Sequence, residues 1–192
     1  MKNIYSASEV IKNAYYLFMT KITMRESRFV RRPIYIRGKK SISGGRNLTT
    51  GRFCRWDLNG KRKSLYIGDN CEMGDMVHIV AHRFVKIGEN VLIASKCFIS
   101  DTNHGQYIGE TQDSPKTNPN DRNLIEGTVI IGNRVWIGEN VVILAGTEIG
   151  DGCIIGANSV VSKKIPENSM VVGCNRIVKQ WDGAHSKWVK MN

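Results

Sequence analysis

The stretch IGNRVWIGENVVILAGTEIGDGCIIGANSVV, residues 131–161, repeats an aliphatic residue every six positions. The repeated residues are Ile131, Ile137, Ile143, Ile149, Ile155 and Val161. An amphipathic helix would return its apolar residues after three or four positions, and a half-buried strand would return them after two. A period of six is instead typical of a parallel β-helix, in which each hexad forms a short strand and a turn and three hexads complete one coil.

Two other positions of the hexad follow the same period. The second is glycine in the hexads that begin at residues 131, 137, 149 and 155, where the chain turns a corner that a side chain would crowd. The fifth holds small residues that fit beside the aliphatic wedge, namely Val135, Val141, Thr147, Cys153 and Ser159. The sequence therefore predicts an all-β fold in which wedges and small residues fill a narrow prism.

The hexad pattern extends toward the N-terminus. Three further groups of wedges are expected: Ile67, Met73 and Ile79; Ile87, Ile93 and Ile99; and a degenerate first group of Ile36, Ile42 and Leu48. Three hexads per coil then predict about five coils. The expected organisation is an N-terminal helical cap over residues 1–35, a β-helix domain over residues 36–166, and a C-terminal extension over residues 167–192.

Two segments interrupt the period. The first is short, CRWDLNGKRKS at residues 54–64, and the second is DTNHGQYIGETQDSPKTNPNDRNLIEG at residues 101–127. A loop as long as the second in a compact domain is usually functional or disordered. Because it begins with a histidine, we expect a functional loop that protrudes from the prism.

The N-terminal segment SASEVIKNAYYLFMTKI predicts a helix. Ser6 and Glu9 have the spacing of a capping box, and apolar residues follow at helical spacing: Val10, Ala14, Leu17 and Phe18. The favoured interpretation is a helix that packs this apolar face on the open end of the prism. The alternative is a helix that lies on a membrane surface, with Lys12, Lys21 and the following arginines toward anionic lipid.

Composition limits the function classes. The 28 Lys and Arg residues against 17 Asp and Glu give a formal charge of +11, which attracts anions at long range. Aromatic residues do not interleave with the basic clusters and no nucleic-acid motif accompanies them, so nucleic acid binding is not expected. No apolar run reaches the 18 residues of a membrane span, so a cytoplasmic protein is expected. The five cysteines, without a CxxC pair, predict reduced core residues.

The region from residue 67 to 180 resembles a known family. IGENVLIASKCFISDTNHG and VWIGENVVILAGTEIGDGCIIGANSVVSKKIPENSMVVG, with the long loop between them, carry the resemblance. The region is similar to the hexapeptide-repeat acyltransferases, especially the galactoside and maltose acetyltransferases and the bacterial O-acetyltransferases that modify surface polysaccharides. The resemblance implies a left-handed parallel β-helix, a homotrimer with active sites between subunits, acetyl-CoA as co-substrate, and no metal.

His104 matches the catalytic histidine of that family. A neutral imidazole can take the proton of a sugar hydroxyl as the hydroxyl attacks a thioester carbonyl. Asp101 is a candidate to orient the ring, although a backbone carbonyl is an alternative. His82 and Asn103 are expected near the acceptor. Without the resemblance, His104 would be read as an ordinary loop histidine that makes a turn contact.

The residues after the WIG turn imply an oxyanion site. In the family an amide at this place stabilises the tetrahedral intermediate, and here it is the backbone N–H of Glu139, next to Gly138. The side chain of Glu139 differs from the small hydroxyl residue of the galactoside branch, so only the backbone group is carried over. Trp136 flanks the acetyl and pantetheine end of the cofactor in the family, and its alternative role is packing in a subunit interface.

The remaining cofactor contacts are also implied by the resemblance. Backbone groups around Ala145 and Ala157 are candidates to pair with the pantetheine amides. The segment after the last regular hexad is expected to hold the nucleotide phosphates through Ser162, Lys163 and Lys164, with lysine acting as a point charge. Arg176 is a further candidate, but GCNRIVK departs from the family pattern Gly-x-Pro-Ala-Arg/Lys, so Lys179 is a substitute.

The sequence thus predicts an O-acetyltransferase that acts on a carbohydrate, either a surface polysaccharide or a lipid-linked glycan at the inner face of the membrane, with peripheral membrane association. One alternative is an N-acetyltransferase of an amino sugar or another small acceptor. A second is a zinc enzyme like the gamma-class carbonic anhydrases, which would use His78, His82 and His104. A third is a non-catalytic β-helix scaffold.

Overall fold

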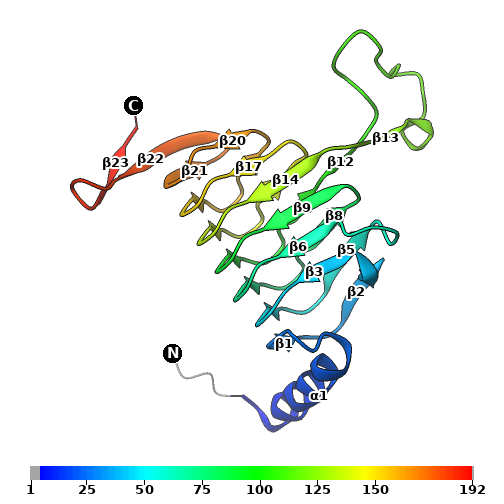
Figure 1. The fold of residues 1–192 in the computed structure, drawn as a ribbon, viewed down its shortest axis with the longest axis vertical. Coiled ribbons are helices and arrows are strands. Elements are labelled where there is room, and N and C mark those ends of the chain that lie inside the picture. Colours follow the sequence, from blue (N-terminus) through cyan, green and yellow to red (C-terminus); the bar gives the residue numbers. More distant parts are fainter. Residues whose placement is uncertain (1–4, 192) are drawn as a thin grey trace.

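Isoleucine side chains stacked one above another hold together a three-sided column of short strands (Figure 1). The structure is a computed structural model that describes residues 5–191. Three sheets of parallel strands, here called A, B and C, form the three sides, and their strands follow one another in that order along the chain. The predicted parallel β-helix is confirmed.

Sheet A contains β1 (Phe29–Val30), β4 (Thr49–Thr50), β7 (Glu72–Met73), β10 (Leu92–Ile93), β15 (Trp136–Ile137), β18 (Ile154–Ile155) and β21 (Ser169–Val172). Sheet B contains β2 (Ile34–Arg37), β5 (Cys54–Leu58), β8 (His78–Ala81), β11 (Phe98–Ser100), β16 (Val142–Ile143) and β19 (Val160–Val161). Sheet C contains β3 (Ile42–Gly44), β6 (Leu65–Ile67), β9 (Phe84–Ile87), β14 (Thr128–Ile131), β17 (Glu148–Ile149) and β20 (Lys164–Ile165). Short 3-10 turns lie at Lys39–Ser41 and Pro119–Asp121.

The parallel register places each wedge directly over the wedge of the preceding coil. Ile93 pairs with Ile137, and Ile137 pairs with Ile155. All three side chains are fully buried. The small residues at the fifth position of the hexads are buried as well, as predicted: Cys71, Val77, Val91, Cys97, Val135, Val141, Thr147, Cys153 and Ser159. One large and one small side chain per hexad therefore fill the interior.

The glycine at the second position of the hexad is required by the close approach of the next coil. A Cβ on Gly138 would lie 2.7 Å from the backbone nitrogen of Ala157. Two residues later, Asn140 has a positive φ of 57°, which places it in the left-handed region that asparagine tolerates. These two residues together turn the chain from sheet A into sheet B.

The column has six complete coils and a further strand of sheet A, one coil more than expected. Residues 54–64 do not leave the stack as predicted, because β5 lies between β2 and β8 in sheet B. Trp56 in β5 is fully buried where an isoleucine stands in other coils, so the hexad pattern does not identify this strand. The column also begins earlier than residue 36, since β1 pairs with β4.

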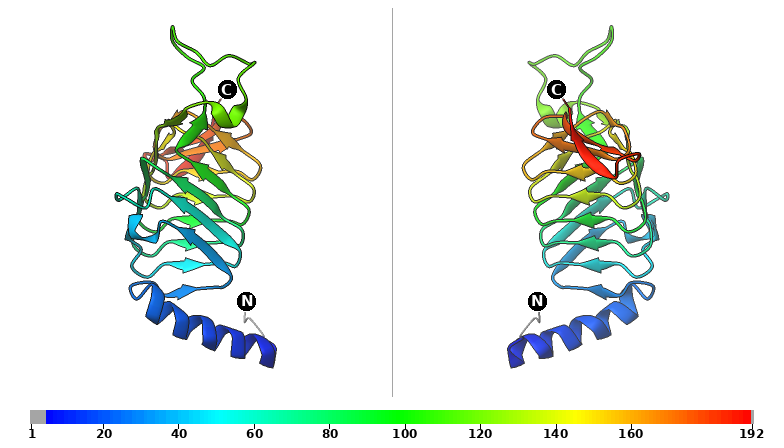
Figure 2. Two further views of the ribbon diagram at one scale, coloured as in Figure 1. Left: turned by 90° about the vertical axis from the view of Figure 1, so that its right-hand side faces the viewer. Right: turned by 90° about the vertical axis from the view of Figure 1, so that its left-hand side faces the viewer.

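Helix α1 (Ala7–Thr23) begins at the predicted capping box, in which Ser6 and Glu9 hydrogen-bond to each other. It crosses below the first coil (Figure 2). The predicted packing of its apolar face is wrong, because Val10, Leu17 and Phe18 are 55%, 47% and 64% exposed. The helix is held to the column near its C-terminal end, where Thr20 is buried and its hydroxyl accepts a hydrogen bond from the backbone N–H of Val30 at 2.9 Å.

The C-terminal segment continues the column before it leaves it. β21 pairs in parallel with β18, so the stack extends past residue 166 to Val172. β22 (Arg176–Asp182) then runs antiparallel to β21, and β23 (Lys187–Lys190) pairs with β22 in a hairpin that projects from the column (Figure 1). The predicted extension therefore contributes one strand of the prism and the hairpin.

Four of the five cysteines are buried in the core, as the sequence predicts. Cys54, Cys71, Cys97 and Cys153 are free thiols in the core, and Cys174 is exposed. Burial raises the pKa of the Cys54 thiol to about 11, so this group stays protonated near neutral pH.

Among residues 5–191, no helix combines the length and apolar character needed to cross a bilayer.

Candidate active site

The candidate histidine lies where the chain leaves the fourth coil. β12 (Thr102–His104) follows β11 directly and pairs in antiparallel fashion with β13 (Leu124–Glu126), which leads into β14. These two strands form the neck of the loop, and residues 105–123 project beyond it (Figure 1). His104 is exposed at the outer end of the neck, opposite Leu124. The neck departs from the corner between sheets B and C, here called the B–C corner.

The backbone of His104 is fixed by the root of the loop. Its carbonyl oxygen accepts a hydrogen bond from the Tyr107 hydroxyl at 2.5 Å, and Arg122 Nη1 donates to the same hydroxyl oxygen at 2.6 Å. The backbone N–H of Gly105 donates to the carbonyl oxygen of Asn123 at 2.9 Å. Within residues 5–191, no hydrogen bond involves the His104 imidazole, so the ring is available to a substrate from a fixed backbone.

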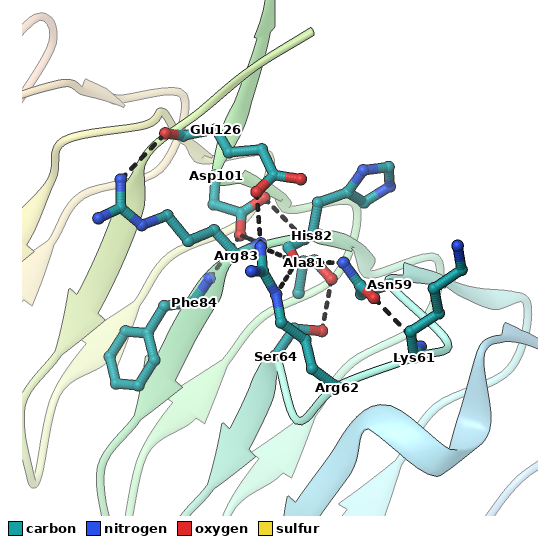
Figure 3. A network of polar contacts seen from close by, with 10 residues as sticks. All are labelled: Asn59, Lys61, Arg62, Ser64, Ala81, His82, Arg83, Phe84, Asp101 and Glu126. Carbon is teal, nitrogen blue, oxygen red and sulfur yellow. Dashed lines mark hydrogen bonds and ion pairs between the residues drawn. The ribbon is translucent and has the colours of Figure 1, made fainter.

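Asp101 has a structural role in place of the predicted orienting role. Its fully buried carboxylate accepts the backbone N–H groups of His82, Arg83 and Phe84 at 3.0, 2.7 and 2.9 Å (Figure 3). No hydrogen bond found in the described part of the chain joins Asp101 to the His104 ring. The carboxylate therefore holds the turn of the coil below, and the sequence alone does not reveal these main-chain partners.

His82 lies in that turn, one coil below the neck. Its backbone N–H donates to Asp101, and its carbonyl oxygen accepts from Asn59 Nδ2 at 2.8 Å and from Arg62. The imidazole of His82 has no hydrogen-bond partner among the described residues and projects away from Asp101 (Figure 3). The turn places His82 on the same corner as His104, and its contact with the acceptor stays a prediction.

Asn103 does not share the His104 side of the neck. Successive side chains of a strand point to opposite faces, so Asn103 and His104 lie on opposite faces of the two-stranded ribbon. Asn103 is exposed and pairs with Ile125 through the ladder. Its predicted acceptor contact therefore requires a pocket on the other face of the neck.

An ion pair that the sequence analysis missed ties the neck to the column. Arg62 Nη2 lies 2.6 Å from Glu126 Oε2, and Arg83 Nη1 donates to the backbone carbonyl oxygen of Glu126 at 3.4 Å. Glu126 stands opposite Thr102 in the neck. The only sequence signal for this contact is the basic run at residues 61–63, which does not indicate a partner more than sixty positions away.

The predicted oxyanion group lies on a different corner, between sheets A and B. Glu139 follows Gly138 in the turn after β15, and its backbone N–H has no hydrogen-bond partner within residues 5–191. Trp136 is 52% exposed on sheet A, between Leu92 and Ile154 in the ladder. Ala157 occupies the equivalent turn one coil above. A free N–H beside an exposed aromatic side chain fits the implied thioester end of a cofactor.

The other predicted cofactor residues lie above the neck. Ala145 and Lys163 are on the B–C corner, and Lys163 is exposed. The Ser162 backbone N–H and hydroxyl are both bonded to the Asn175 side chain at 2.9 Å. Lys164 Nζ lies 2.9 Å from Glu148 Oε2, and this hydrogen bond raises the pKa of the lysine.

Arg176 is exposed at the start of β22, where it pairs with Val172. Its side chain forms no hydrogen bond or ion pair within residues 5–191. Lys179, the predicted substitute, is exposed further along the same strand and pairs with Met170. Arg176 directly follows Asn175, whose side chain is hydrogen-bonded to Ser162 next to Lys163, so the phosphate contact of Arg176 stays a prediction, as does that of Lys179.

One protomer does not bring the two groups of site residues together. His104 lies on the B–C corner, and Glu139 lies on the A–B corner across sheet B. Six residues separate Glu139 from Ala145, so the side is at most roughly 20 Å wide at the rise of an extended strand. Within one column, the two groups of candidate residues therefore lie on different corners.

His78 is not part of a histidine cluster. Its Nε2 lies 3.2 Å from Asp57 Oδ2 on the outer face of sheet B, and its ring stacks obliquely on Phe98. Burial alone would raise the pKa of Asp57, but hydrogen bonds from His78 and Arg55 lower it below its usual range. In the part of the chain described, no three His, Cys, Asp or Glu side chains come together as ligands for a metal ion.

Replacement of Asp101 tests its structural role. Asp101→Asn exchanges one acceptor oxygen for an NH2 group that faces backbone donors, so the free energy of unfolding should fall by about 2–4 kcal/mol. Urea denaturation measures this loss. Asp151→Asn is the matched control, because Asp151 also accepts a backbone N–H but its side chain is 37% exposed. A shift in the pH profile of kcat/KM, with stability unchanged, would show instead that Asp101 orients the His104 ring.

Comparisons with known proteins agree with the repeat. The family model described as bacterial transferase hexapeptide (six repeats) matches residues 128–163. The putative lipopolysaccharide biosynthesis O-acetyl transferase WbbJ of Escherichia coli K12 is 42% identical over 176 residues, which cover 91% of this chain and 89% of that protein. The galactoside O-acetyltransferase of E. coli K12 is 38% identical over 115 residues, which cover 57% of this chain and 50% of that protein.

Solved structures show the same fold. A galactoside acetyltransferase in complex with coenzyme A matches with a TM-score of 0.59 and 27% identity, over 81% of this chain and 73% of that chain. The hexapeptide-repeat acetyltransferase VCA0836 of Vibrio cholerae O1 biovar eltor, complexed with acetyl coenzyme A, matches with a TM-score of 0.60 and 25% identity, over 74% of this chain and 72% of that chain. With its repeated hexads, its three-sided column and a relative that matches nearly its whole length, this chain belongs to the bacterial hexapeptide-repeat transferases.

Proposed function

We propose that this protein is an O-acetyltransferase that transfers the acetyl group of acetyl-CoA to a hydroxyl group of a carbohydrate. The observation that carries the proposal is the exposed His104 ring on a fixed backbone at the corner where the loop leaves the column. The family assignment and the similarity to O-acetyltransferases over nearly the whole chain support the reaction class. The same geometry would serve an amine acceptor, but no observation favours one.

The chemistry uses two groups of the chain. The His104 imidazole takes the proton of the acceptor hydroxyl as the oxygen attacks the thioester carbonyl, because a free sugar hydroxyl is a poor nucleophile near neutral pH. The oxygen of the tetrahedral intermediate accepts a hydrogen bond from the unpaired backbone N–H of Glu139. When the intermediate collapses, the C–S bond breaks and the imidazolium returns its proton to the CoA thiolate. No acyl-enzyme forms in this sequence.

The site is completed by a second copy of the chain, in a homotrimer. His104 of one copy faces the A–B corner of its neighbour, which supplies Glu139 and Trp136. An exposed apolar row on sheet A supports such a contact, since Leu92 and Trp136 are 46% and 52% exposed next to each other in the ladder. A closed ring of three copies would place one site in each of three identical clefts.

Acetyl-CoA extends from this cleft toward the C-terminal coils. The small side chain of Ala157 leaves room for the pantetheine arm along the A–B corner, and that of Ala145 does so on the facing corner. Lys163 is exposed two coils above the neck and provides a charge for the nucleotide phosphates. Lys164 is paired with Glu148 in the free chain, so a phosphate must compete with that carboxylate.

The acceptor is a surface polysaccharide intermediate or a lipid-linked glycan, and the protein works at the cytoplasmic face of the membrane. The apolar side of α1 supports peripheral membrane association, because it is exposed at the open end of the column. Basic residues flank its C-terminal end, which complements anionic lipid: Lys21, Arg25, Lys39 and Lys40.

Loss of the histidine should stop the reaction. His104→Ala should lower kcat by about 100- to 10,000-fold, as for removal of a general base. Release of free CoA thiol with a panel of glycan acceptors measures the rate. His185→Ala is the control, since His185 lies in the C-terminal hairpin and pairs with Asp182. Unchanged turnover in His104→Ala, with CoA still bound, would overturn the proposed role.

Mixed oligomers test the shared site. Glu139→Pro removes the backbone N–H from a turn whose next residue, Asn140, has positive φ, a turn type that accepts proline there. Glu139→Ala keeps the N–H and should keep the activity. Separate His104→Ala and Glu139→Pro proteins should be inactive, and random co-assembly should restore about a quarter of the parent activity. A mixture that stays inactive, despite confirmed co-assembly, would place the whole site within one copy.

Membrane association is tested by weakening the apolar side of α1. Phe18→Ser with Ile22→Ser removes two side chains that are 64% and 58% exposed. Binding to vesicles with anionic lipid should fall at least tenfold, because each large side chain contributes about 1.5–3 kcal/mol on leaving water. Co-sedimentation measures binding, and Val189→Ser in the distant hairpin is the control. A parent protein that does not sediment with these vesicles would contradict the proposal.

A further inference from the structure

Positive charge is concentrated on the corner that carries the histidine neck. The three turns of the B–C corner below the neck, residues 38–41, 59–64 and 82–83, contain six basic residues and no acidic one: Lys39, Lys40, Lys61, Arg62, Lys63 and Arg83. In the same three coils the A–B corner contains Arg31, Arg32, Arg52 and Asp75, and the C–A corner contains Arg46, Asp69 and Glu89. The formal charge of the three turns is therefore +6 on the B–C corner, against +2 on the A–B corner and −1 on the C–A corner.

The register of the column makes these turns a continuous strip. β2, β5, β8 and β11 are successive neighbours in sheet B, so the turns that follow them lie one above another. At the usual spacing of paired strands, the lowest turn lies about 14 Å below the neck. The strip therefore begins at the foot of the column and ends beside His104.

Half of the six basic side chains are held by the protein. Arg62 binds Glu126 and the carbonyl oxygen of His82, and Lys63 Nζ donates to the carbonyl oxygens of Lys40 and Ile42 at 2.9 and 2.6 Å. Lys39 Nζ donates to the carbonyl oxygen of Thr23, at the C-terminal end of α1. These contacts fix the backbone of the turns and join the foot of the strip to the helix.

Two of the remaining lysines and the His82 ring have no fixed partner among the described residues. Within residues 5–191, the side chains of Lys40 and Lys61 and the ring of His82 form no hydrogen bond or ion pair. Lys61 and His82 extend on the same side of the turns, away from Asp101 (Figure 3). Arg83 makes only the contact of 3.4 Å with the Glu126 carbonyl oxygen. Free cationic donors on a rigid turn suit a ligand with several negative oxygens.

The strip lies on the acceptor side of the reaction. Acetyl-CoA is assigned to the coils above the neck, which leaves the coils below it for an acceptor that reaches His104. We propose that the B–C corner below the neck binds the diphosphate that links the acceptor glycan to its carrier. This inference rests on the proposed function, and it names the acceptor class as a glycosyl diphosphate.

Two carriers share this chemistry, a polyprenyl lipid and a nucleoside. The structure relates the strip to the lipid carrier through one contact, because its lowest turn binds the end of the helix whose apolar side is exposed. A lipid carrier would then start at α1, its diphosphate would lie on the strip, and its sugars would reach His104. The test separates the two carriers.

Binding of inorganic pyrophosphate to the CoA-saturated protein tests the strip directly, because saturating CoA occupies its own phosphate site. Lys40→Gln with Lys61→Gln should weaken this binding about ten- to 100-fold in titration calorimetry, the effect of losing charge-assisted hydrogen bonds. Within residues 5–191 neither lysine side chain forms a hydrogen bond or ion pair, so the two replacements should not disturb the fold. Lys187→Gln with Lys190→Gln in the hairpin is the control for the loss of two charges. Equal pyrophosphate affinity in the parent and the strip variant would overturn the inference.

Kinetics with three acceptors that share one sugar identify the carrier. The acceptors are a methyl glycoside, a nucleoside diphosphate sugar and a short-chain polyprenyl diphosphate sugar. The parent should have a KM at least about tenfold lower for one or both diphosphates than for the methyl glycoside, and the strip variant should lose that difference. The diphosphate-linked sugar whose KM is lower than that of the methyl glycoside identifies the carrier. An equal KM for all three acceptors in the parent would overturn the inference while leaving acetyl transfer intact, whereas failure to bind CoA would overturn the proposed function itself.

Discussion

The fold depends on the contact of each aliphatic wedge with the wedges above and below it. A hexad cannot bury its own isoleucine, because its strand is two residues long and has no second layer to cover it. Burial comes only when the next coil places its wedge on top, as Ile93, Ile137 and Ile155 do. The column is therefore stable as a stack, and its sides must stay in register along the whole length.

This constraint decides where chemistry can be placed. The interior has no room for a substrate, so functional groups must come from the corners or from outward-facing side chains of the strands, such as Trp136. The neck of the long loop uses a corner without breaking the stack, since β11 and β14 both keep their pairing with the coil below. Asp101 closes the corner under the neck by holding three N–H groups, and Arg62 joins the neck to the turn two coils below it. Asp101 and Arg62 thus hold the turns and the neck that carry His104.

The periodic part of the molecule is predictable from the sequence, and the remainder is not. The regular hexads from residue 131 onward predict strand positions and burial almost residue by residue. The interior takes one large and one small side chain from each hexad, which fixes the positions that face inward. Trp56 shows the limit, since a buried tryptophan in place of an isoleucine conceals a strand that belongs to the stack. The helix shows another, because a capping box predicts where α1 begins but not which of its faces meets the column. For the site, resemblance identifies His104, whereas the partners of Asp101 and Arg62 lie in other coils and depend on the register.

The antiparallel strand β22 affects whether columns can associate end to end at high concentration. A stack of parallel strands ends in an open edge that another stack could extend, and repeated extension would produce fibres. Here the edge strand β21 is already paired with a strand that runs the opposite way and bears a bulge near Met170. On sheet A, an incoming parallel strand therefore finds the edge of the column already occupied by β22.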